Sequence, residues 1–133
     1  MSQTGGCLCG AVRYELAEAP TVMGVCHCKN CQKQAGSAFS TLAAVPIAGF
    51  TLTGTPKQYV DRDTDSGNYV ERWFCGDCGS PIYSALPSMA DQIFLKTGTL
   101  DDTSGFAPQF NVWCSTKQDW VDLPEGVPAL EKT

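Results

Sequence analysis

The sequence predicts a mainly β, single-domain fold that contains zinc. Three observations support this prediction. The chain has 133 residues, which is the size of one domain. Its apolar segments are short and rich in β-branched and aromatic residues, and 13 glycines and 8 prolines mark turns between them. Seven of its eight cysteines fall into three tight groups, which is typical of thiolate metal sites.

The first half of the chain predicts short strands and one short helix. The expected strands are 11–16, 21–25, 38–45, 50–52 and 57–60. Asn30 to Ala35 is long enough for one or two helical turns, and Gly36 is expected to end them because glycine readily adopts a left-handed backbone. We expect Pro46 to stop the strand before it, and a turn at 54–56 to separate the next two strands.

The second half predicts further strands and a terminal tail. After a polar loop at 61–67, the expected strands are 69–74, 81–86, 92–100 and 109–114. No apolar run is long enough to span a membrane, and no repeat or linker divides the chain. We therefore expect one domain over 1–133, with a core at about 5–120 and a tail at 121–133 that is loosely held from Leu123 onward.

The three cysteine groups differ in the number of ligands they offer. They are a C-x-C pair, a C-x-C-x-x-C triplet and a C-x-x-C pair: Cys7 and Cys9; Cys26, Cys28 and Cys31; Cys75 and Cys78. Zinc is the expected metal because it prefers soft sulfur ligands in tetrahedral geometry. Four ligands close a structural site, whereas three leave a coordination position at which chemistry can occur.

Two other uses of the cysteines stay open. A disulfide framework requires an oxidising compartment, but the first six residues show no signal peptide, and cysteines within a group are too close to link distant segments. The sequence therefore favours a reduced, cytoplasmic chain. An iron–sulfur cluster would usually show the longer ferredoxin spacing, although a single iron in four thiolates remains an alternative.

The outer pairs suit a structural site. Cys75 and Cys78 lie on one tight turn, in which Gly79 is expected to take a positive φ. Backbone N–H groups of such turns point toward the sulfurs and stabilise the thiolates. A site that joins this pair to Cys7 and Cys9 would pin the N-terminal turn to the middle of the sheet.

The triplet suits an open site, because three thiolates from one local segment leave the fourth direction free. His27 is the only histidine, and in an extended segment it would point away from the cysteines on either side. We expect it to have a hydrogen-bonded structural role, with zinc ligand and proton shuttle as alternatives. Cys114 is isolated, so we expect a buried small hydrophobe, with a metal role as the alternative.

Three motifs, in order along the chain, resemble the glutathione-dependent formaldehyde-activating enzyme family, also called the centromere-protein-V-like family. They are GCLCGAVRY at 6–14, CHCKNCQK at 26–33 with GSAF at 36–39, and FCGDCGS at 74–80. The resemblance extends from Gly5 to about Trp120. It implies an Mss4-like fold, in which the sheets form a tent. It also implies a structural zinc at Cys7, Cys9, Cys75 and Cys78, and a second, catalytic zinc at Cys26, Cys28 and Cys31.

The resemblance further implies a carbon–sulfur lyase that forms or splits S-hydroxymethylglutathione, or a similar adduct of a thiol and an aldehyde. We hypothesise that Lys29 and Lys33, one helical turn apart, hold carboxylates of the thiol substrate; their alternative is a solvated helix face. The aromatic residues Phe39, Phe110 and Trp113 are candidates for an apolar wall of the site, with core packing as the alternative.

Two other function classes compete with the lyase. One is a non-catalytic Mss4-like zinc module that binds a protein partner. A complete triplet weighs against it, because a structural module needs only the four-cysteine site. The other is a nucleic-acid binder. The formal net charge of −5 weighs against it, because binding of a phosphate backbone relies on clustered Lys and Arg.

Overall fold

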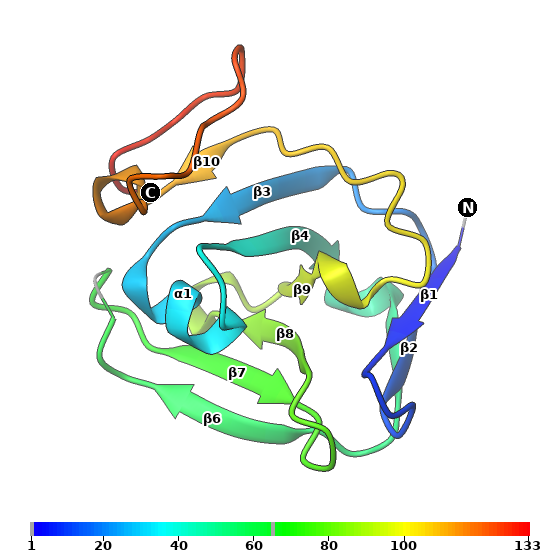
Figure 1. Cartoon of the computed structure of the whole chain (residues 1–133). Coiled ribbons are helices and arrows are strands. Elements are labelled where there is room, and N and C mark those ends of the chain that lie inside the picture. The colour runs from blue at the N-terminus through cyan, green and yellow to red at the C-terminus, as the bar shows by residue number, and fades with distance from the viewer. Residues whose placement is uncertain (1, 65) are drawn as a thin grey trace.

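The described residues form a small antiparallel sheet and a large, mostly antiparallel sheet (Figure 1). The computed structural model describes residues 2–64 and 66–133, so Met1 and position 65 of the expected polar loop lie outside the described residues. The small sheet has the order β1-β2-β5, with β1 at Gln3–Gly6, β2 at Arg13–Leu16 and β5 at Phe50–Thr53. The predicted mainly β, single-domain fold is confirmed.

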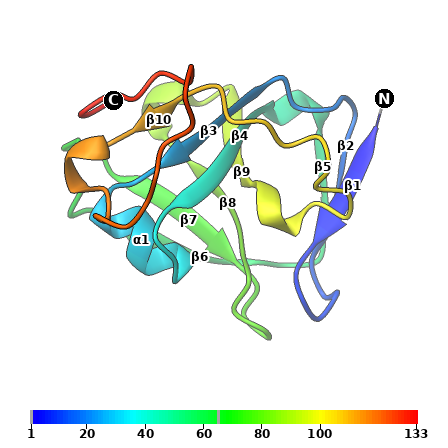
Figure 2. The ribbon, with the colours of Figure 1, turned by 45° about the horizontal axis from the view of Figure 1, so that its top comes forward.

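The large sheet has the order β10-β3-β4-β9-β8-β7-β6, in which the pair β10–β3 is parallel. Its strands are β3 Val22–Cys26, β4 Ser40–Pro46, β6 Lys57–Asp61, β7 Val70–Phe74, β8 Pro81–Ala85, β9 Gln92–Lys96 and β10 Asn111–Val112. Short 3₁₀ turns lie at Ile47–Gly49, Pro87–Met89, Thr97–Thr99 and Cys114–Thr116. Figures 1 and 2 both show the small sheet at the end of the large sheet opposite the single α-helix.

That helix, α1, covers Lys29–Ala35. Its N-cap is Cys28, whose sulfur accepts a hydrogen bond from the Cys31 N–H at 3.2 Å. It ends, as predicted, at Gly36, which has a left-handed φ of 64°. A seven-residue helix is too short to be stable alone, so α1 depends on its contacts with the sheets.

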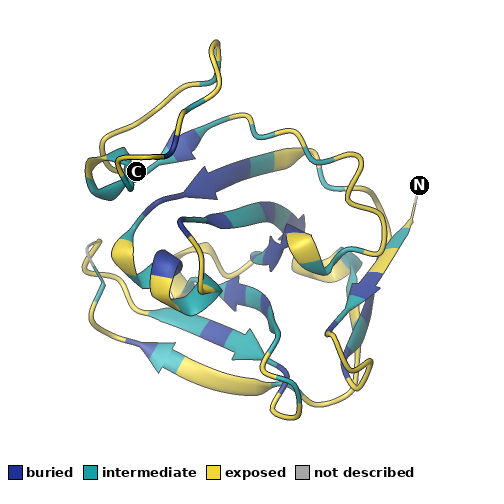
Figure 3. Cartoon of the chain, in the orientation of Figure 1, coloured by how far each residue is buried: buried dark blue, intermediate teal, exposed yellow. Residues whose placement is uncertain are grey.

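The core lies where the small sheet meets one face of the large sheet. Its buried members are Cys7, Val12, Tyr14, Leu16, Val45, Cys75, Ile82, Ile93 and Leu95. Alternation along the strands sends Ile93 and Leu95 of β9 into this core, whereas Phe94 and Lys96 face a cavity on the other side. Fully burying a side chain such as Leu95 contributes about 1.5–3 kcal/mol. Figure 3 shows the buried residues along β9 and the C-terminal half of β3.

Several boundaries differ from the sequence prediction. Strand β1 was not expected, because a Gly-rich tetrapeptide has low β propensity and forms a strand here only by pairing with β2. The strand expected at 92–100 ends at Lys96 and continues as a 3₁₀ turn. The strand expected at 109–114 is reduced to Asn111–Val112.

The expectation of a loosely held tail is wrong. Residues 128–132 run beside β10 and exchange backbone hydrogen bonds with 111–115. The Asn111 N–H donates to Pro128 O at 2.8 Å, and the Leu130 N–H donates to Asn111 O at 2.8 Å. The tail is ordered because it satisfies backbone groups at the edge of the large sheet.

Within residues 2–64 and 66–133, no helix has the length and apolar character needed to cross a lipid bilayer.

Candidate metal centres and the adjoining cavity

The outer cysteine pairs come together at one point. The Sγ atoms of Cys7, Cys9, Cys75 and Cys78 all lie within 4.8 Å of one another. Cys9 Sγ is 3.6 Å from Cys7 Sγ and 3.8 Å from Cys75 Sγ. Zn–S bonds of about 2.3 Å place tetrahedral ligands about 3.8 Å apart, whereas a disulfide bond is about 2.05 Å long. The spacing therefore fits a metal ion and excludes a disulfide between these pairs.

Two turns present these sulfurs, and hydrogen bonds link the turns. The Val12 N–H donates to Cys7 Sγ at 3.3 Å, as expected for a backbone group that stabilises a thiolate. In the second turn, the Gly79 N–H donates to Cys75 O at 2.8 Å, and Gly79 has the predicted positive φ, of 81°. The Leu8 N–H donates to Ser80 Oγ at 3.0 Å, which ties the first turn to the second.

The thiols of this group shift one another's pKa in opposite directions. A hydrogen bond from the Ser80 hydroxyl lowers the pKa of Cys78 to about 5. A backbone hydrogen bond from Ala11 acts to lower the pKa of Cys9, but the neighbouring Cys7 raises it, with a net value of about 12. Several thiolates at one point repel each other, so full ionisation of the group requires a positive ion between them.

The triplet forms the second group. Cys26 ends β3, Cys28 caps α1 and Cys31 lies in the first turn of α1, and their Sγ atoms all lie within 4.8 Å of one another. Cys26 and Cys31 are buried, whereas Cys28 is partly exposed. Hydrogen bonds from Cys26 and then Cys28 lower the pKa of Cys31 to about 2. Hydrogen bonds with Cys28 and then Cys31 strongly raise the pKa of Cys26. This donor set also fits a cation that binds thiolates.

His27 anchors the triplet from the opposite side. Its side chain is buried, and Nε2 lies 3.0 Å from Asn111 Oδ1 of β10. The Gln32 side chain, in α1, donates to His27 O at 2.8 Å and to Thr116 O at 3.0 Å. These contacts agree with the expected structural role, and His27 lies outside both of the cysteine groups described above. Cys114 also lies outside them, and is partly exposed rather than buried.

A buried carboxylate holds the other side of the triplet segment. The Asn30 side chain, between Cys28 and Cys31, donates to Asp61 Oδ2 at 2.9 Å. The Arg72 guanidinium binds the same carboxylate, with its Nε donating at 3.0 Å. Asp61 and Arg72 could not be predicted from the sequence, because a lone acid at a strand end and a basic residue in a strand give no signal until the fold pairs them.

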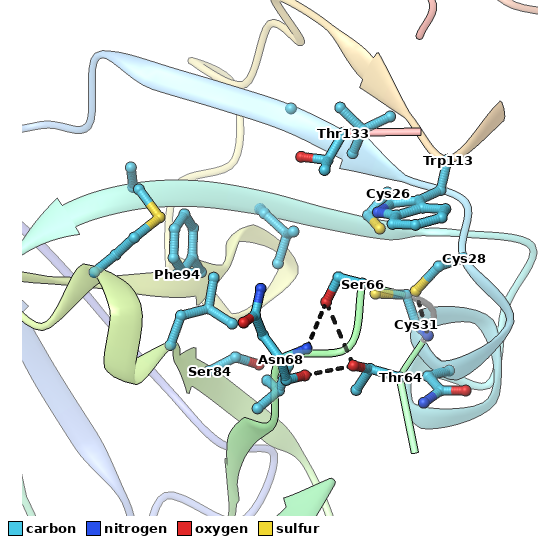
Figure 4. Close-up of a pocket in the computed structure, with 18 of the residues that line it drawn as sticks. Cys26, Cys28, Cys31, Thr64, Ser66, Asn68, Ser84, Phe94, Trp113 and Thr133 are labelled. Atoms are coloured by element: carbon cyan, nitrogen blue, oxygen red, sulfur yellow. Dashed lines mark hydrogen bonds between the residues drawn. The ribbon is translucent and has the colours of Figure 1, made fainter. Parts of the chain in front are cut away.

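A cavity of about 420 Å³ opens beside the triplet (Figure 4). All three cysteines line it, together with residues of the large sheet and with Thr64, Ser66, Asn68, Phe110, Val112 and Trp113. Trp113 lines it beside Cys26, with a left-handed φ of 58° that costs on the order of 1–3 kcal/mol in a residue other than glycine. Surrounding contacts therefore hold this residue in place, including the hydrogen bond from its N–H to Lys132 O at 2.9 Å.

Only some of the candidate substrate-contact residues line the cavity. Phe110 and Trp113 line the cavity, as one of the two interpretations of these aromatics expected. Phe39 instead packs against the His27 ring, with the ring centroids 5.5 Å apart. The hypothesis that Lys29 and Lys33 hold substrate carboxylates stays a prediction: both side chains are exposed on α1, and neither lines the cavity.

The cations that do line the cavity are Arg72 and Lys96. Lys96 is 6% exposed, and its Nζ donates to Ser40 Oγ at 2.7 Å. Burial lowers the pKa of the Lys96 ammonium, and the nearby Cys31 thiol opposes this change. Within the described residues no carboxylate pairs with Lys96, so its charge faces the cysteines. The only sequence signal for Lys96 was its position directly after the apolar residues 93–95.

Sequence comparison finds one family model that covers most of the chain. The model of the glutathione-dependent formaldehyde-activating enzyme matches residues 2–116. An "Uncharacterized lyase" of Schizosaccharomyces pombe is 23% identical over 90% of this chain and 83% of its own length. A Halomonas elongata protein named "Putative glutathione-dependent formaldehyde-activating enzyme" is 25% identical over 90% of this chain and 79% of its own length.

Structure comparison finds a similar fold in a crystal structure of a Rhodobacter sphaeroides protein. The TM-score is 0.57, at 20% sequence identity, over 79% of this chain and 91% of the other. At this level of identity the match supports the fold alone.

Proposed function

Because the chain belongs to the glutathione-dependent formaldehyde-activating enzyme family, we propose that it is a carbon–sulfur lyase that forms or splits S-hydroxymethylglutathione at the triplet Cys26, Cys28 and Cys31. The observation that carries this proposal is the position of the triplet in the wall of the cavity of about 420 Å³. This volume lies within the range of about 300–1,000 Å³ usual for small-molecule sites.

The two cysteine groups have different tasks in this proposal. Cys7, Cys9, Cys75 and Cys78 hold a structural zinc, because four thiolates complete a tetrahedral site. Cys26, Cys28 and Cys31 hold a second zinc, because three thiolates leave a ligand position for a substrate. Zinc bound there supplies Lewis acidity and lowers the pKa of a coordinated thiol.

The chain keeps the triplet rigid. Two polar contacts hold its segment from opposite sides: His27 with Asn111, and Asn30 with Asp61. Cys28 also serves as the N-cap of α1, which fixes the start of the helix relative to β3. A site held in this way loses little freedom when a substrate binds, which lowers the entropic cost of reaching the reactive geometry.

Lys96 balances negative charge at the site. Three thiolates and a divalent zinc leave one net negative charge, and the buried Lys96 ammonium lies close enough to interact with all three cysteines. The apolar side chains around it limit access of water, which strengthens this interaction. Lys96 is therefore a positioning residue that stabilises the ionised triplet.

The proposal is tested by NMR exchange spectroscopy on equilibrated glutathione and formaldehyde, because the adduct also forms without a catalyst. Zinc-loaded protein should accelerate exchange between free glutathione and the adduct, and the Cys28→Ser variant should not. The matched control is Cys114→Ser, which replaces a cysteine outside both groups. Equal exchange with and without wild-type protein would reject the lyase, and would favour a zinc module that binds a protein partner.

A further inference from the structure

The cavity extends well beyond the triplet along the strands that form it. In the register of the sheet, Cys26 lies opposite Ser40, and Val22 lies opposite Ala44, which in turn pairs with Phe94. With a rise of about 3.3 Å per residue, the row of Val22 lies about 13 Å from the row of Cys26. Figure 4 shows Phe94 on the far side of the cavity from the three cysteines.

The far end of the cavity is mainly apolar, with one buried hydroxyl. Ser84 Oγ, which has no hydrogen-bond partner among the described residues, lies opposite Phe94 in the sheet register. The other walls of the far end come from Val22, Ala44, Leu86, Met89 and Phe94. Among these wall residues there is no charged side chain, so a charged ligand group would find no ionic partner there. In the polar loop along one side, the Asn68 N–H donates to Ser66 Oγ at 3.3 Å and the Thr64 hydroxyl donates to the Asn68 carbonyl.

Close packing maintains this space. Gly24 lies between Cys26 and Val22 on β3, and a Cβ built there would come within 2.2 Å of the Phe110 ring. Only glycine allows the aromatic ring to lie directly on the strand at this point. Phe110 thereby becomes a wall of the cavity, between its two ends.

The charges of the cavity lie at the cysteine end or are already paired. Arg72 is neutralised by Asp61, with an N–O distance of 2.9 Å, and Lys96 lies beside the cysteines. Glutathione carries two carboxylates and one ammonium group, and the walls of the far end offer no unpaired charged side chain to bind them. A formaldehyde adduct adds a single carbon to the sulfur, so it would leave the far end unfilled.

We infer that the far end receives the alkyl chain of a medium-length aliphatic aldehyde, so that the preferred adduct is a hemithioacetal larger than that of formaldehyde. This inference rests on the proposed lyase function. In the forward direction a bond forms between the thiol sulfur and the carbonyl carbon, and the thiol proton ends on the former carbonyl oxygen. The reverse direction breaks the same bond, and neither direction requires an oxidant or a reductant.

The first test is a binding series that does not depend on turnover. Ethanethiol, 1-butanethiol and 1-hexanethiol are titrated calorimetrically into zinc-loaded protein. Each methylene group buried at the far end should lower Kd about fourfold, from a transfer free energy of about 0.8 kcal/mol. The same Kd for all three thiols would overturn the inference.

A pair of variants locates the effect. Ala44→Leu fills the far end and should weaken binding of 1-hexanethiol at least tenfold more than binding of ethanethiol. Ala48→Leu makes the same change at an exposed position outside the cavity. This variant should keep the wild-type dependence of Kd on the length of the thiol. If Ala44→Leu does not fold, Ala44→Val makes a smaller change with the same expected direction. The same dependence of Kd on thiol length in the Ala44 and Ala48 variants would overturn the inference.

A second arm separates the inference from the lyase proposal. Exchange is measured for glutathione with formaldehyde and for glutathione with hexanal, and we expect greater acceleration with hexanal. Acceleration with formaldehyde, together with the same Kd for all three thiols, would overturn the inference of an alkyl site but would support the lyase proposal. No acceleration with either aldehyde, together with a Kd that falls as the thiol becomes longer, would reject the lyase proposal and support the alkyl site.

Discussion

The two cysteine groups use the same ligand chemistry in opposite structural settings. The four-cysteine group joins turns that lie far apart in the chain, since Cys9 and Cys75 are 66 residues apart and their sulfurs are 3.8 Å apart. The triplet comes from one stretch of six residues, between the end of β3 and the first turn of α1. In the proposed function, four ligands from distant segments would make a cross-link, whereas three ligands from one segment in a cavity wall would leave a place for a substrate.

This difference predicts how the fold depends on each site. A metal that joins distant segments contributes directly to the free energy of folding, because it closes a long loop only in the native state. A metal held by neighbouring residues can also bind the unfolded chain, so it contributes less to the free energy of folding. Loss of the first metal should therefore unfold the protein, and loss of the second should leave it folded.

The largest effect is expected for Cys75→Ser. This change removes a buried ligand of the four-cysteine group and should destabilise the protein by several kcal/mol, because the site then no longer joins the N-terminal turn to the β7–β8 turn. Urea unfolding followed by circular dichroism measures the change. Cys114→Ser is the control, and its free energy of unfolding should remain close to that of wild type. Equal stability of the two variants would contradict a structural role for the four-cysteine group.

The next effect is expected for Cys28→Ser, which should reduce acceleration of adduct exchange at least about a hundredfold with a stability change below about 1 kcal/mol. Serine is a poor zinc ligand but a good N-cap, so it can replace Cys28 at the start of α1. Cys28→Ala also removes the cap and should be about 1 kcal/mol less stable than Cys28→Ser. Loss of the fold in Cys28→Ser would show that the triplet is structural.

A smaller effect is expected for Lys96→Met. Removal of the buried ammonium leaves the negative charge of the triplet uncompensated, so the affinity of the triplet for zinc should fall about tenfold. Competition with a chromophoric chelator measures this affinity. Lys33→Met is the matched control, because Lys33 is exposed on α1 and does not line the cavity. The same affinity in both variants would show that Lys96 has no influence on the triplet.

The smallest effect is expected for Tyr14→Phe, on the small sheet beside the four-cysteine group. The Tyr14 hydroxyl is 2.7 Å from Thr99 Oγ1, and loss of this hydrogen bond should cost about 1 kcal/mol at neutral pH. Burial raises the pKa of Tyr14 to about 12. The folded state thus holds the phenolic proton more tightly than the unfolded state does, and this contribution to stability is present below about pH 10 and lost as the pH rises toward about 12.

Urea unfolding of wild type and Tyr14→Phe across this range measures the difference. The stability of wild type should fall more steeply with pH than that of the variant. Parallel slopes would show that the phenol does not titrate differently in the two states.

Local spacing in the sequence was enough to predict how the cysteines group. Each pair lies on one turn and the triplet spans one strand end and one helix start, so chain geometry alone brings their members together. The end of α1 at Gly36 and the positive φ of Gly79 were predictable for the same reason, since each depends on a single residue type.

Contacts between distant strands were not predictable in this way. The Asp61 carboxylate meets Arg72 and Asn30 only once β6, β7 and α1 are assembled. The pairing of the tail with β10 has no periodic signal in its sequence, and strand β1 has none either. The cavity itself depends on which faces of four or more strands meet. Lys29 and Lys33 were chosen by closeness in sequence, whereas Lys96 reaches the triplet by closeness in the fold.

The most direct test of the contrast between the two sites is stepwise removal of zinc with a chelator, with zinc content, adduct exchange and circular dichroism followed on the same samples. The triplet should lose its metal first, because its open position lets a chelator enter through the cavity. We predict that acceleration of exchange disappears with the first equivalent of zinc while the β signal persists, and that the fold is lost only with the second. Unfolding with the first equivalent, or exchange that survives its removal, would contradict this account.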